Sequence, residues 1–254
     1  MALRELDAPC AVGTAWLQEG EYTMKKSFAA LPLVALCACA KPYAGVPYAA
    51  PAAPITSVGL VDDSLPEEVV AYEAASTMGN FGLIGALIDA GVQASRKDRV
   101  NDALESINYQ PEPTFEAYLG EAMARNGVRT TVVETGTREK RKFLPKYPTG
   151  RADAQALLDV NVVGFGYSNA GNQLWRPTVL ADVRMVDAAT GKTMMENRIA
   201  YNVVDSQAGV VTIAPNAEYA FANREDMVTQ PERLAAGLDD ALRQVADAAV
   251  RLMK

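Results

Sequence analysis

The sequence predicts an α/β (α+β two-layer) fold, in which helices pack mainly on one face of a mixed β-sheet. Two observations lead to this prediction. Three apolar-rich runs between residues 156 and 204 are separated by turn-rich gaps, which is the pattern of a C-terminal three-strand meander. Segments with apolar residues at helical spacing, together with short β-branched runs, occupy much of the remaining chain.

The N-terminal part of the chain has the pattern of a bacterial export signal. Two lysines follow Met24, and an apolar run extends from Phe28 to Ala38. This run is too short to be a transmembrane helix. We therefore interpret residues 24–39 as a signal peptide that starts at Met24, and residues 1–23 as an upstream extension from a mis-assigned start. A genuine N-terminal extension is the alternative.

The end of this signal resembles the lipobox of bacterial lipoproteins. In Leu36-Cys37-Ala38-Cys39, leucine stands at −3 and alanine at −1, with cysteine where Ala or Ser is usual at −2. The resemblance implies acylation of Cys39. Because residue 40 is not Asp, it also implies a lipid anchor in the outer membrane, on its periplasmic face. The alternative is ordinary cleavage after Ala38-Cys39-Ala40, an A-x-A pattern, which would release a soluble periplasmic protein.

The chain after Cys39 is expected to consist of a tether and a single globular domain. Residues 40–54 are rich in Pro, Ala and Tyr and form the tether, and residues 55–254 form the domain. The first elements expected are a strand at 55–61, a loop at 62–68 and a segment at 69–78 compatible with strand or helix. Residues 82–107 predict a helix packed on the sheet, with an interfacial helix beside the lipid anchor as the alternative.

Two further elements are expected before the meander. Thr114 is a candidate cap for a helix with an apolar stripe that begins at Phe115, and Gly127 is a candidate end of that helix. The β-branched residues at 128–134 predict a strand. The basic run at 138–142 is expected to be a solvated loop, since no aromatic residue is interleaved with it as in a nucleic-acid patch.

The meander follows. A short helical lead-in is expected at 151–156, and strands are expected at 157–167, 178–186 and 194–204. Alternation of side chains places Leu158 on one face of the first strand, and Asp159 and Asn161 on the other. Gly164 and Gly166 inside this strand bracket Phe165 and are typical of a bulge or a close backbone approach. The run at 187–192 (DAATGK) has the residues of a tight hairpin turn.

The last part of the chain is expected to contain a loop and a helix. Residues 205–226 are loop-like. Thr229-Gln230-Pro231-Glu232 has the pattern of a capping box, with Thr229 as the cap. The helix that follows has one apolar stripe, formed by Leu234, Leu238, Leu242, Val245, Ala249 and Leu252. Core packing accounts for this stripe.

The amino-acid composition excludes several kinds of catalytic and metal-binding site. The chain has 254 residues, a net charge of −7 and no histidine. Without histidine, the commonest general base and metal ligand is missing. The three cysteines, Cys10, Cys37 and Cys39, all precede the expected domain, which excludes a disulfide, a thiol nucleophile or a cysteine metal site within it. We therefore expect no cofactor, no metal and, given the acidic balance, no nucleic-acid partner.

A family resemblance adds to this interpretation. An exported lipoprotein with the order strand, helix, strand, an ALLDV strand at 156–160 and a VDAATGK hairpin at 186–192 resembles the envelope lipoproteins related to the curli-secretion lipoprotein. It is also similar to the N-terminal domain of the Tol-system translocation protein. The resemblance covers about residues 55–254 and implies helices behind a sheet that ends in such a hairpin. It transfers no functional residues.

Three classes of function are compatible with these patterns. The first is a non-enzymatic exported lipoprotein of the bacterial cell envelope that binds a protein partner or self-assembles, in envelope assembly or secretion. The second is a periplasmic or lipid-anchored binding module for a small envelope ligand, such as a lipid or glycan. The third is an enzyme with a carboxylate pair, Asp159 and Asp182, although outward polar positions explain both residues better.

One loop is the candidate interaction surface. Tyr167, Leu174, Trp175 and Arg176 flank the turn between the first two meander strands. Trp, Tyr and Arg are over-represented in binding hot spots. We therefore predict a partner-binding loop here, with packing of Trp175 into its own hairpin or under the next strand as the alternative.

Overall fold

The computed structural model of the chain describes residues 43–74, 94–138, 141–170, 173–202 and 208–254. The chain divides into the units Met1–Ala40 and Lys41–Lys254, and all described residues belong to the second. The expected extension, the signal peptide and Cys39 lie outside the described residues, as do residues 82–93 of the expected helix. In the second unit, the predicted fold class is confirmed.

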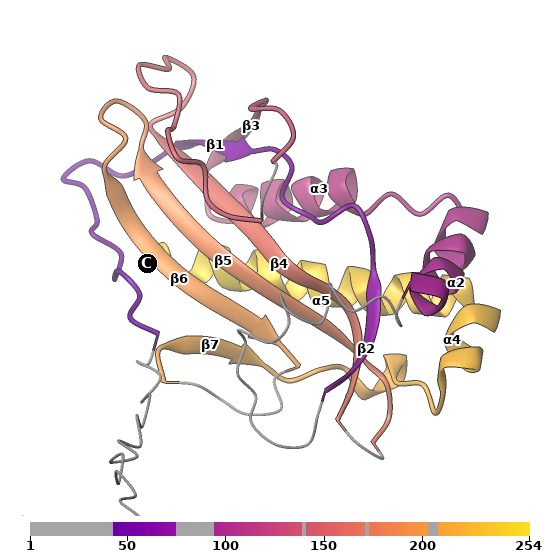
Figure 1. Ribbon diagram of the computed structural model, residues 1–254. Helices are drawn as coiled ribbons and strands as arrows, with labels where there is room; N and C mark the ends of the chain where they lie inside the picture. The colour runs from indigo at the N-terminus through magenta and orange to yellow at the C-terminus, as the bar shows by residue number, and fades with distance from the viewer. Residues whose placement is uncertain (1–42, 75–93, 139–140, 171–172, 203–207) are drawn as a thin grey trace, which may run out of the picture. The chain divides into compact units, whose positions relative to one another are not determined.

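The described elements form one mixed sheet with helices beside it (Figure 1). In chain order they are β1 (Ser57–Val61), β2 (Val70–Ala74), α2 (Ala94–Ser106), α3 (Pro111–Ala124), β3 (Arg129–Val133), β4 (Ala156–Ala170), β5 (Arg176–Asp187), β6 (Thr193–Tyr201), β7 (Val210–Ile213), a 3-10 turn (Ala217–Tyr219), α4 (Arg224–Thr229) and α5 (Pro231–Arg251). The strand order is β3-β1-β4-β5-β6-β7. The antiparallel run β4-β5-β6 is the predicted meander.

Strands β1 and β2 lie end to end along the same edge of β4. β1 pairs in parallel with the start of β4, at Leu158, and β2 pairs in parallel with its end, at Gly166. Residues 62–69 therefore interrupt what would otherwise be one long strand. A Cβ atom on Gly166 would lie 1.8 Å from the carbonyl oxygen of Val70, so this pairing requires glycine. The register also shifts between Val162 and Gly164, which is the expected irregularity in this strand.

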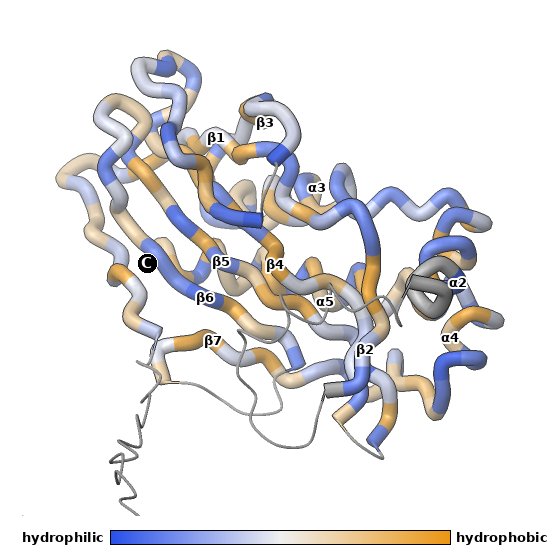
Figure 2. Tube along the Cα trace, in the orientation of Figure 1, coloured by the Kyte–Doolittle hydropathy of each residue, from blue (hydrophilic) through white to orange (hydrophobic). Residues whose placement is uncertain are grey.

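The helical layer covers one face of the meander. In Figure 1, α5 lies behind β4, β5 and β6, and α3 packs beside α5 and against β3. The buried stripe of α5 consists of Leu234, Leu238, Leu242, Val245 and Ala249. It belongs to one core cluster with Val160, Val183 and Ile199 of the three strands. Figure 2 shows hydrophobic and hydrophilic positions interspersed along β4 and β5. On the opposite face, a second, smaller apolar cluster contains Leu157 of β4 and Val186 of β5, together with Val61 and Val133. In the described part of the chain, no helix is long and apolar enough to span a bilayer.

Two helix starts differ from the sequence predictions. α3 begins at Pro111, and Thr114 lies in its first turn, where its hydroxyl donates to the carbonyl of Gln110 at 2.7 Å. α5 begins at Pro231 after Gln230, which makes no side-chain cap, so the expected capping box is not formed. Proline suits the first helical position because its missing N–H would have no partner there.

Other parts of the chain also differ from expectation. Residues 151–155 are not helical, and β4 starts directly at Ala156. The expected loop at 205–226 contains the edge strand β7 and the start of α4. Short strands and single-turn helices carry too few residues for a periodic signal, which is why the sequence did not reveal them.

The lead-in segment, residues 43–49, lies along β6. Val46 and Glu196 exchange backbone hydrogen bonds of 2.7 and 2.9 Å, and the N–H of Ala49 donates to the carbonyl of Met194 at 2.9 Å. A Cβ on Gly45 would lie 2.6 Å from the Glu196 carbonyl oxygen. This part of the expected tether is therefore bound to the sheet edge by backbone hydrogen bonds.

Candidate functional site

The face of the meander away from α3 and α5 carries charged side chains in two rows. Cross-strand pairing aligns Asp159, Arg184 and Glu196 in the first row, and Asn161, Asp182 and Arg198 in the second. These are the outward positions predicted for Asp159 and Asp182. We call this surface the charged face.

Opposite charges on the charged face form ion pairs. Arg184 and Glu196 approach to 2.8 Å, and Arg198 and Asp182 to 2.6 Å. These four side chains are between 17% and 26% exposed, so the pairs are partly shielded from solvent. Partial burial strengthens each attraction and makes loss of one partner more costly than at a fully exposed site.

Aromatic rings cover two of these arginines. The Cζ atom of Arg184 lies 4.0 Å from the ring centroid of Phe143, and that of Arg198 lies 5.0 Å from the ring of Tyr43. Burial, together with the charge of Glu196, raises the pKa of Tyr43 to about 12. Tyr43 therefore stays neutral and holds the lead-in segment against the charged face.

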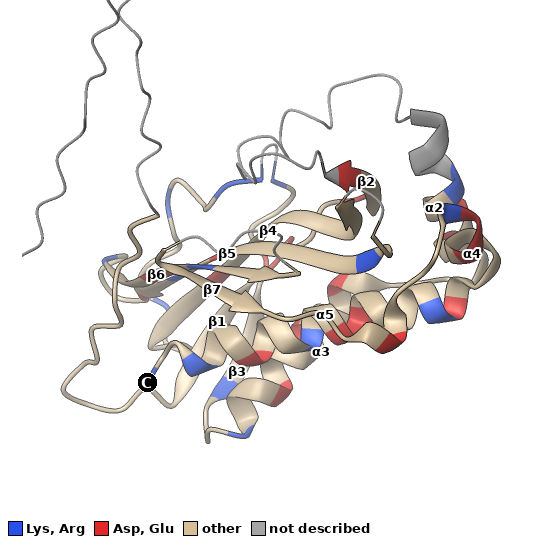
Figure 3. Ribbon diagram, turned by 90° about the horizontal axis from the view of Figure 1, so that it is seen from below, with Lys and Arg blue, Asp and Glu red and all other residues tan. Residues whose placement is uncertain are grey.

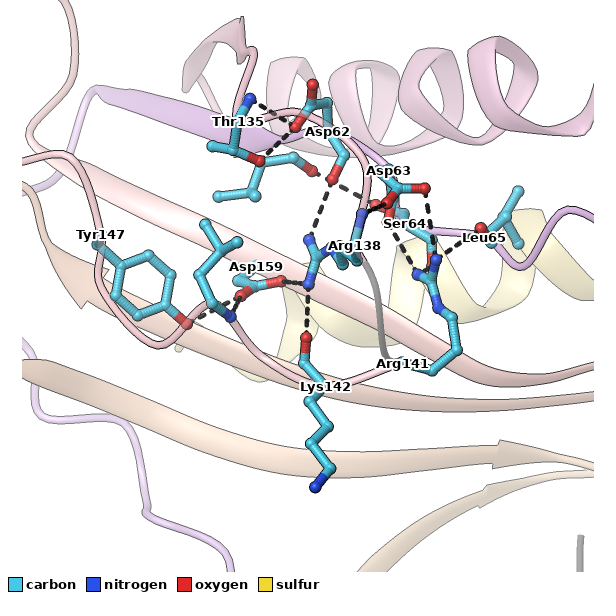
Figure 4. A network of polar contacts seen from close by, with 12 residues as sticks. Asp62, Asp63, Ser64, Leu65, Thr135, Arg138, Arg141, Lys142, Tyr147 and Asp159 are labelled. Carbon is cyan, nitrogen blue, oxygen red and sulfur yellow. Dashed lines mark hydrogen bonds and ion pairs between the residues drawn. The ribbon is translucent and has the colours of Figure 1, made fainter. Parts of the chain in front are cut away.

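Asp159 is the fully buried end of the first row (Figure 4). Its carboxylate lies 2.8 Å from a guanidinium nitrogen of Arg138, and the two side chains are 0% and 2% exposed. It also accepts hydrogen bonds from the Tyr147 hydroxyl at 2.9 Å and the Leu144 backbone N–H at 3.0 Å. Two hydrogen bonds to one carboxylate oxygen and an ion pair to the other make Asp159 a structural centre that joins the loop around 138–147 to β4.

The interruption between β1 and β2 is closed by side chains from distant segments. Arg141 donates to the carbonyls of Asp63, Ser64 and Leu65 at 2.8, 2.6 and 2.8 Å. The carboxylate of Glu112 accepts from the N–H groups of Ser64 and Leu65 at 2.6 and 2.7 Å. Backbone groups that have no strand partner thus find side-chain partners.

The interpretation of residues 138–142 as a solvated loop is wrong for Arg138 and Arg141. The Arg138 side chain is 2% exposed and that of Arg141 is 23% exposed. One feature of the sequence could have indicated that these arginines are not solvated. Two acidic residues, Asp62 and Asp63, stand at the end of a predicted strand and are possible partners for them. Only the fold brings the two segments together.

Asn161 is the unusual member of the second row. Its side chain amide is buried, with 1% of the residue exposed, and neither its oxygen nor its nitrogen has a hydrogen-bond partner. An unpaired buried amide costs about 1–3 kcal/mol. It lies opposite Asp182 in the β4–β5 register.

The positions of Asp159 and Asp182 do not favour a catalytic carboxylate pair. Asp159 and Asp182 belong to different rows, and each is bound to its own arginine, Arg138 and Arg198 respectively. Their oxygens are engaged in ion pairs, which does not favour a shared acid and base function. Within the described ranges, no cluster of three or more acidic, cysteine or histidine side chains could hold a metal ion.

The four residues predicted for the partner-binding loop differ in their exposure to solvent. Tyr167 and Trp175 are 1% and 4% exposed, which corrects their expected position at a surface. Tyr167 fits over Gly237 of α5, where a Cβ would lie 2.1 Å from its hydroxyl. Trp175 pairs with Phe221 through the backbone. Leu174 is 45% exposed and Arg176 is half-buried, and residues 171–172 of this loop lie outside the described residues.

A separate shallow cavity of about 220 Å³ lies between the C-terminal ends of α3 and α5. Its lining residues are Ala122, Arg125, Asn126, Asp247, Val250 and Arg251. Arg125 forms an ion pair with Asp247 within this lining. None of the residues predicted from sequence to form a site lies here.

Comparisons with known proteins identify no family for this chain and only remote similarities of structure. No protein family and no curated protein matches the sequence. Among solved structures, the chain is similar to protein XCC0632 of Xanthomonas campestris, of the family DUF330, with 14% identity, a TM-score of 0.33 and coverage of 55% of this chain and 58% of that one. It is also similar to the PelC dodecamer of Paraburkholderia phytofirmans, with 9% identity, a TM-score of 0.34 and coverage of 84% and 97%. At these values neither likeness identifies a function for this chain.

Proposed function

We propose that this chain is a non-enzymatic exported lipoprotein of the bacterial cell envelope, which binds a protein partner or assembles with itself. The observation that carries the proposal is the export signal that ends in Leu36-Cys37-Ala38-Cys39 immediately before a folded domain. Acylation of Cys39 would anchor the domain to the periplasmic face of the outer membrane. Several acyl chains anchor a protein far more firmly than one.

The charged face supports a binding role. Its carboxylates are neutralised by arginines, and rings of Phe143 and Tyr43 lie over two of those arginines. Such a surface presents half-buried aromatic rings, backed by ion-paired arginines, to a partner while leaving few free acids for chemistry. The exposed Leu174 adds an apolar contact at the end of the same meander.

A second candidate is a binding module for a small envelope ligand, a lipid or a glycan. The unpaired amide of Asn161 favours it, because a buried amide without a partner is suited to a ligand with hydroxyl or carbonyl groups. Titration of the purified protein with envelope glycans and lipids, monitored by calorimetry, would show binding that Asn161→Leu abolishes. Unchanged binding in that variant would exclude this site.

Metabolic labelling with an alkyne fatty acid tests the anchor. We expect wild type to carry the label, Cys39→Ala to lose it and Cys37→Ala to keep it. A soluble, unlabelled wild-type chain that begins at Lys41 would establish ordinary signal-peptidase cleavage instead. The partner is tested by cross-linking in intact cells, where Leu174→Asp should reduce recovery of the cross-linked species and the distant Lys192→Asp should not.

A further inference from the structure

Two uncharged segments lie next to each other at the outer side of β6. The sequence has no charged residue between Lys41 and Asp62, and none between Asp205 and Glu218. The parts of these segments that lie along β6 are the lead-in, which pairs with the first half of β6, and β7, which pairs with the second half. We call them together the neutral edge.

The two segments of the neutral edge are in direct contact. A Cβ atom on Gly209, just before β7, would lie 2.4 Å from the carbonyl oxygen of Tyr43. The backbones approach so closely that the lead-in and β7 continue one another along β6. In Figure 3, β7 carries neither of the colours that mark charge, whereas α5 carries both and α3 carries acidic residues.

The exposed groups of the neutral edge carry no charge. Val46 is 41% exposed, one of only three large hydrophobic side chains exposed to that degree in the described part of the chain. Tyr48, Val210, Val211 and Ile213 are half-buried. Of these, Tyr48, Val211 and Ile213 also pack against the main core cluster, so only part of each side chain faces outward. Such a strip would lose little hydration free energy on contact with a membrane interface, where tyrosine is favoured.

The chain length fixes where an anchor can lie. Cys39 is four residues before Tyr43, and a chain spans at most about 3.6 Å per residue, so the anchor point lies within about 14 Å of Tyr43. Tyr43 is itself held by its ring over Arg198 and by the backbone pairing of Val46. A lipid on Cys39 therefore cannot hold the domain far from the bilayer.

We propose that the neutral edge is a membrane-contacting surface, and that the anchored domain rests with the lead-in and β7 against the lipid headgroups. This inference rests on the proposed acylation of Cys39. Lys41, the only charged residue between Cys39 and Asp62, would lie at the headgroups, where a cation is attracted to anionic lipids. The charged face and the helical layer then remain accessible to other partners.

Single-cysteine probes test this orientation, because no cysteine follows Cys39. Thr212→Cys places a probe at an exposed position of β7. Lys192→Cys in the β5–β6 turn and Ala117→Cys on α3 are matched exposed controls. The full acylated proteins are labelled with an environment-sensitive fluorophore and reconstituted in phosphatidylethanolamine and phosphatidylglycerol vesicles that contain a headgroup-level nitroxide quencher.

We expect quenching at position 212 to exceed that at 192 and 117 at least twofold, and Val46→Glu to reduce it. Equal quenching at the three positions in an acylated chain overturns the inference alone. A chain whose mass shows no acyl group overturns the proposed anchor and this inference with it. Disulfide-linked pairs of the Thr212→Cys chain on vesicles, with the probe shielded from lipid, would assign the edge to a second copy of the chain instead.

Discussion

The two faces of the β4-β5-β6 meander follow the same alternation of side chains but are stabilised in different ways. Toward α5, residues such as Val160, Val183 and Ile199 pack in one apolar cluster, where attraction has no direction and any well-shaped apolar group fits. On the charged face, each ion needs a specific partner at a specific cross-strand position. The apolar face should therefore respond to lost volume, and the charged face to lost partners.

The largest expected effect is at the buried ion pair. Asp159→Ala leaves the Arg138 guanidinium buried without a counter-charge and removes the acceptor of Tyr147, so we expect the free energy of unfolding to fall by about 3–5 kcal/mol. The double variant Asp159→Leu with Arg138→Met removes both charges and should recover part of this loss. Urea denaturation measures both, and equal destabilisation by the single and double variants would contradict the assignment.

The apolar face gives the next effect. Leu242 is fully buried in α5, and Leu242→Ala should lower the free energy of unfolding by about 2–5 kcal/mol through lost contacts and a cavity. Arg243 is the adjacent control, because its side chain is 53% exposed and lies 3.8 Å from Glu121. Arg243→Ala should change stability by less than about 1 kcal/mol. Similar thermal midpoints for the two variants would argue against a packed α5.

A smaller effect is expected where the charged face meets solvent. The side chains of Asp182 and Arg198 are 17% and 25% exposed. Asp182→Asn weakens this ion pair and should lower the free energy of unfolding by about 1–2 kcal/mol. The exposed pair of Arg99 and Glu225 is the matched control, with exposures of 57% and 63%. Glu225→Gln should cost less than about 0.5 kcal/mol. If chemical denaturation gives the same change for both, burial does not set the strength of these pairs.

The smallest effect is a pH dependence at the interruption between β1 and β2. Burial raises the pKa of Glu112 above its ordinary value of 4.5, although the N–H groups of Ser64 and Leu65 oppose this. The folded state therefore binds this proton more tightly than the unfolded state, so its contribution to stability grows as the pH falls toward 4.5 and is lost as the pH rises through the folded pKa.

Glu112→Gln removes this titration. Relative to the variant, wild type should be more stable at pH 4.5 than at pH 7, as measured by denaturation at the two pH values. A difference between the two proteins that is independent of pH, or that changes in the opposite direction, would show that the carboxyl of Glu112 does not titrate in this way.

Local patterns in the sequence determined the fold class, the meander, the turn at 187–192 and the buried stripe of α5. In each case the signal is periodic or confined to a few neighbouring residues. The Asp187 carboxylate, for example, accepts from the N–H groups of Ala189 and Thr190, and Gly191 adopts a φ of 71°, as the turn pattern requires. Such interactions depend on neighbours in the chain and can be predicted without the fold.

The tertiary structure alone decided which polar and aromatic residues are buried. The basic run at 138–142 has the same composition whether it is solvated or closed over a strand. Arg141 is partly buried because it meets carbonyls that lie 76 to 78 residues away in the chain. Tyr167 and Trp175 similarly depend on α5 and on Phe221, and the lead-in depends on the free edge of β6. Burial is a property of partners distant in sequence, and a local pattern does not contain them.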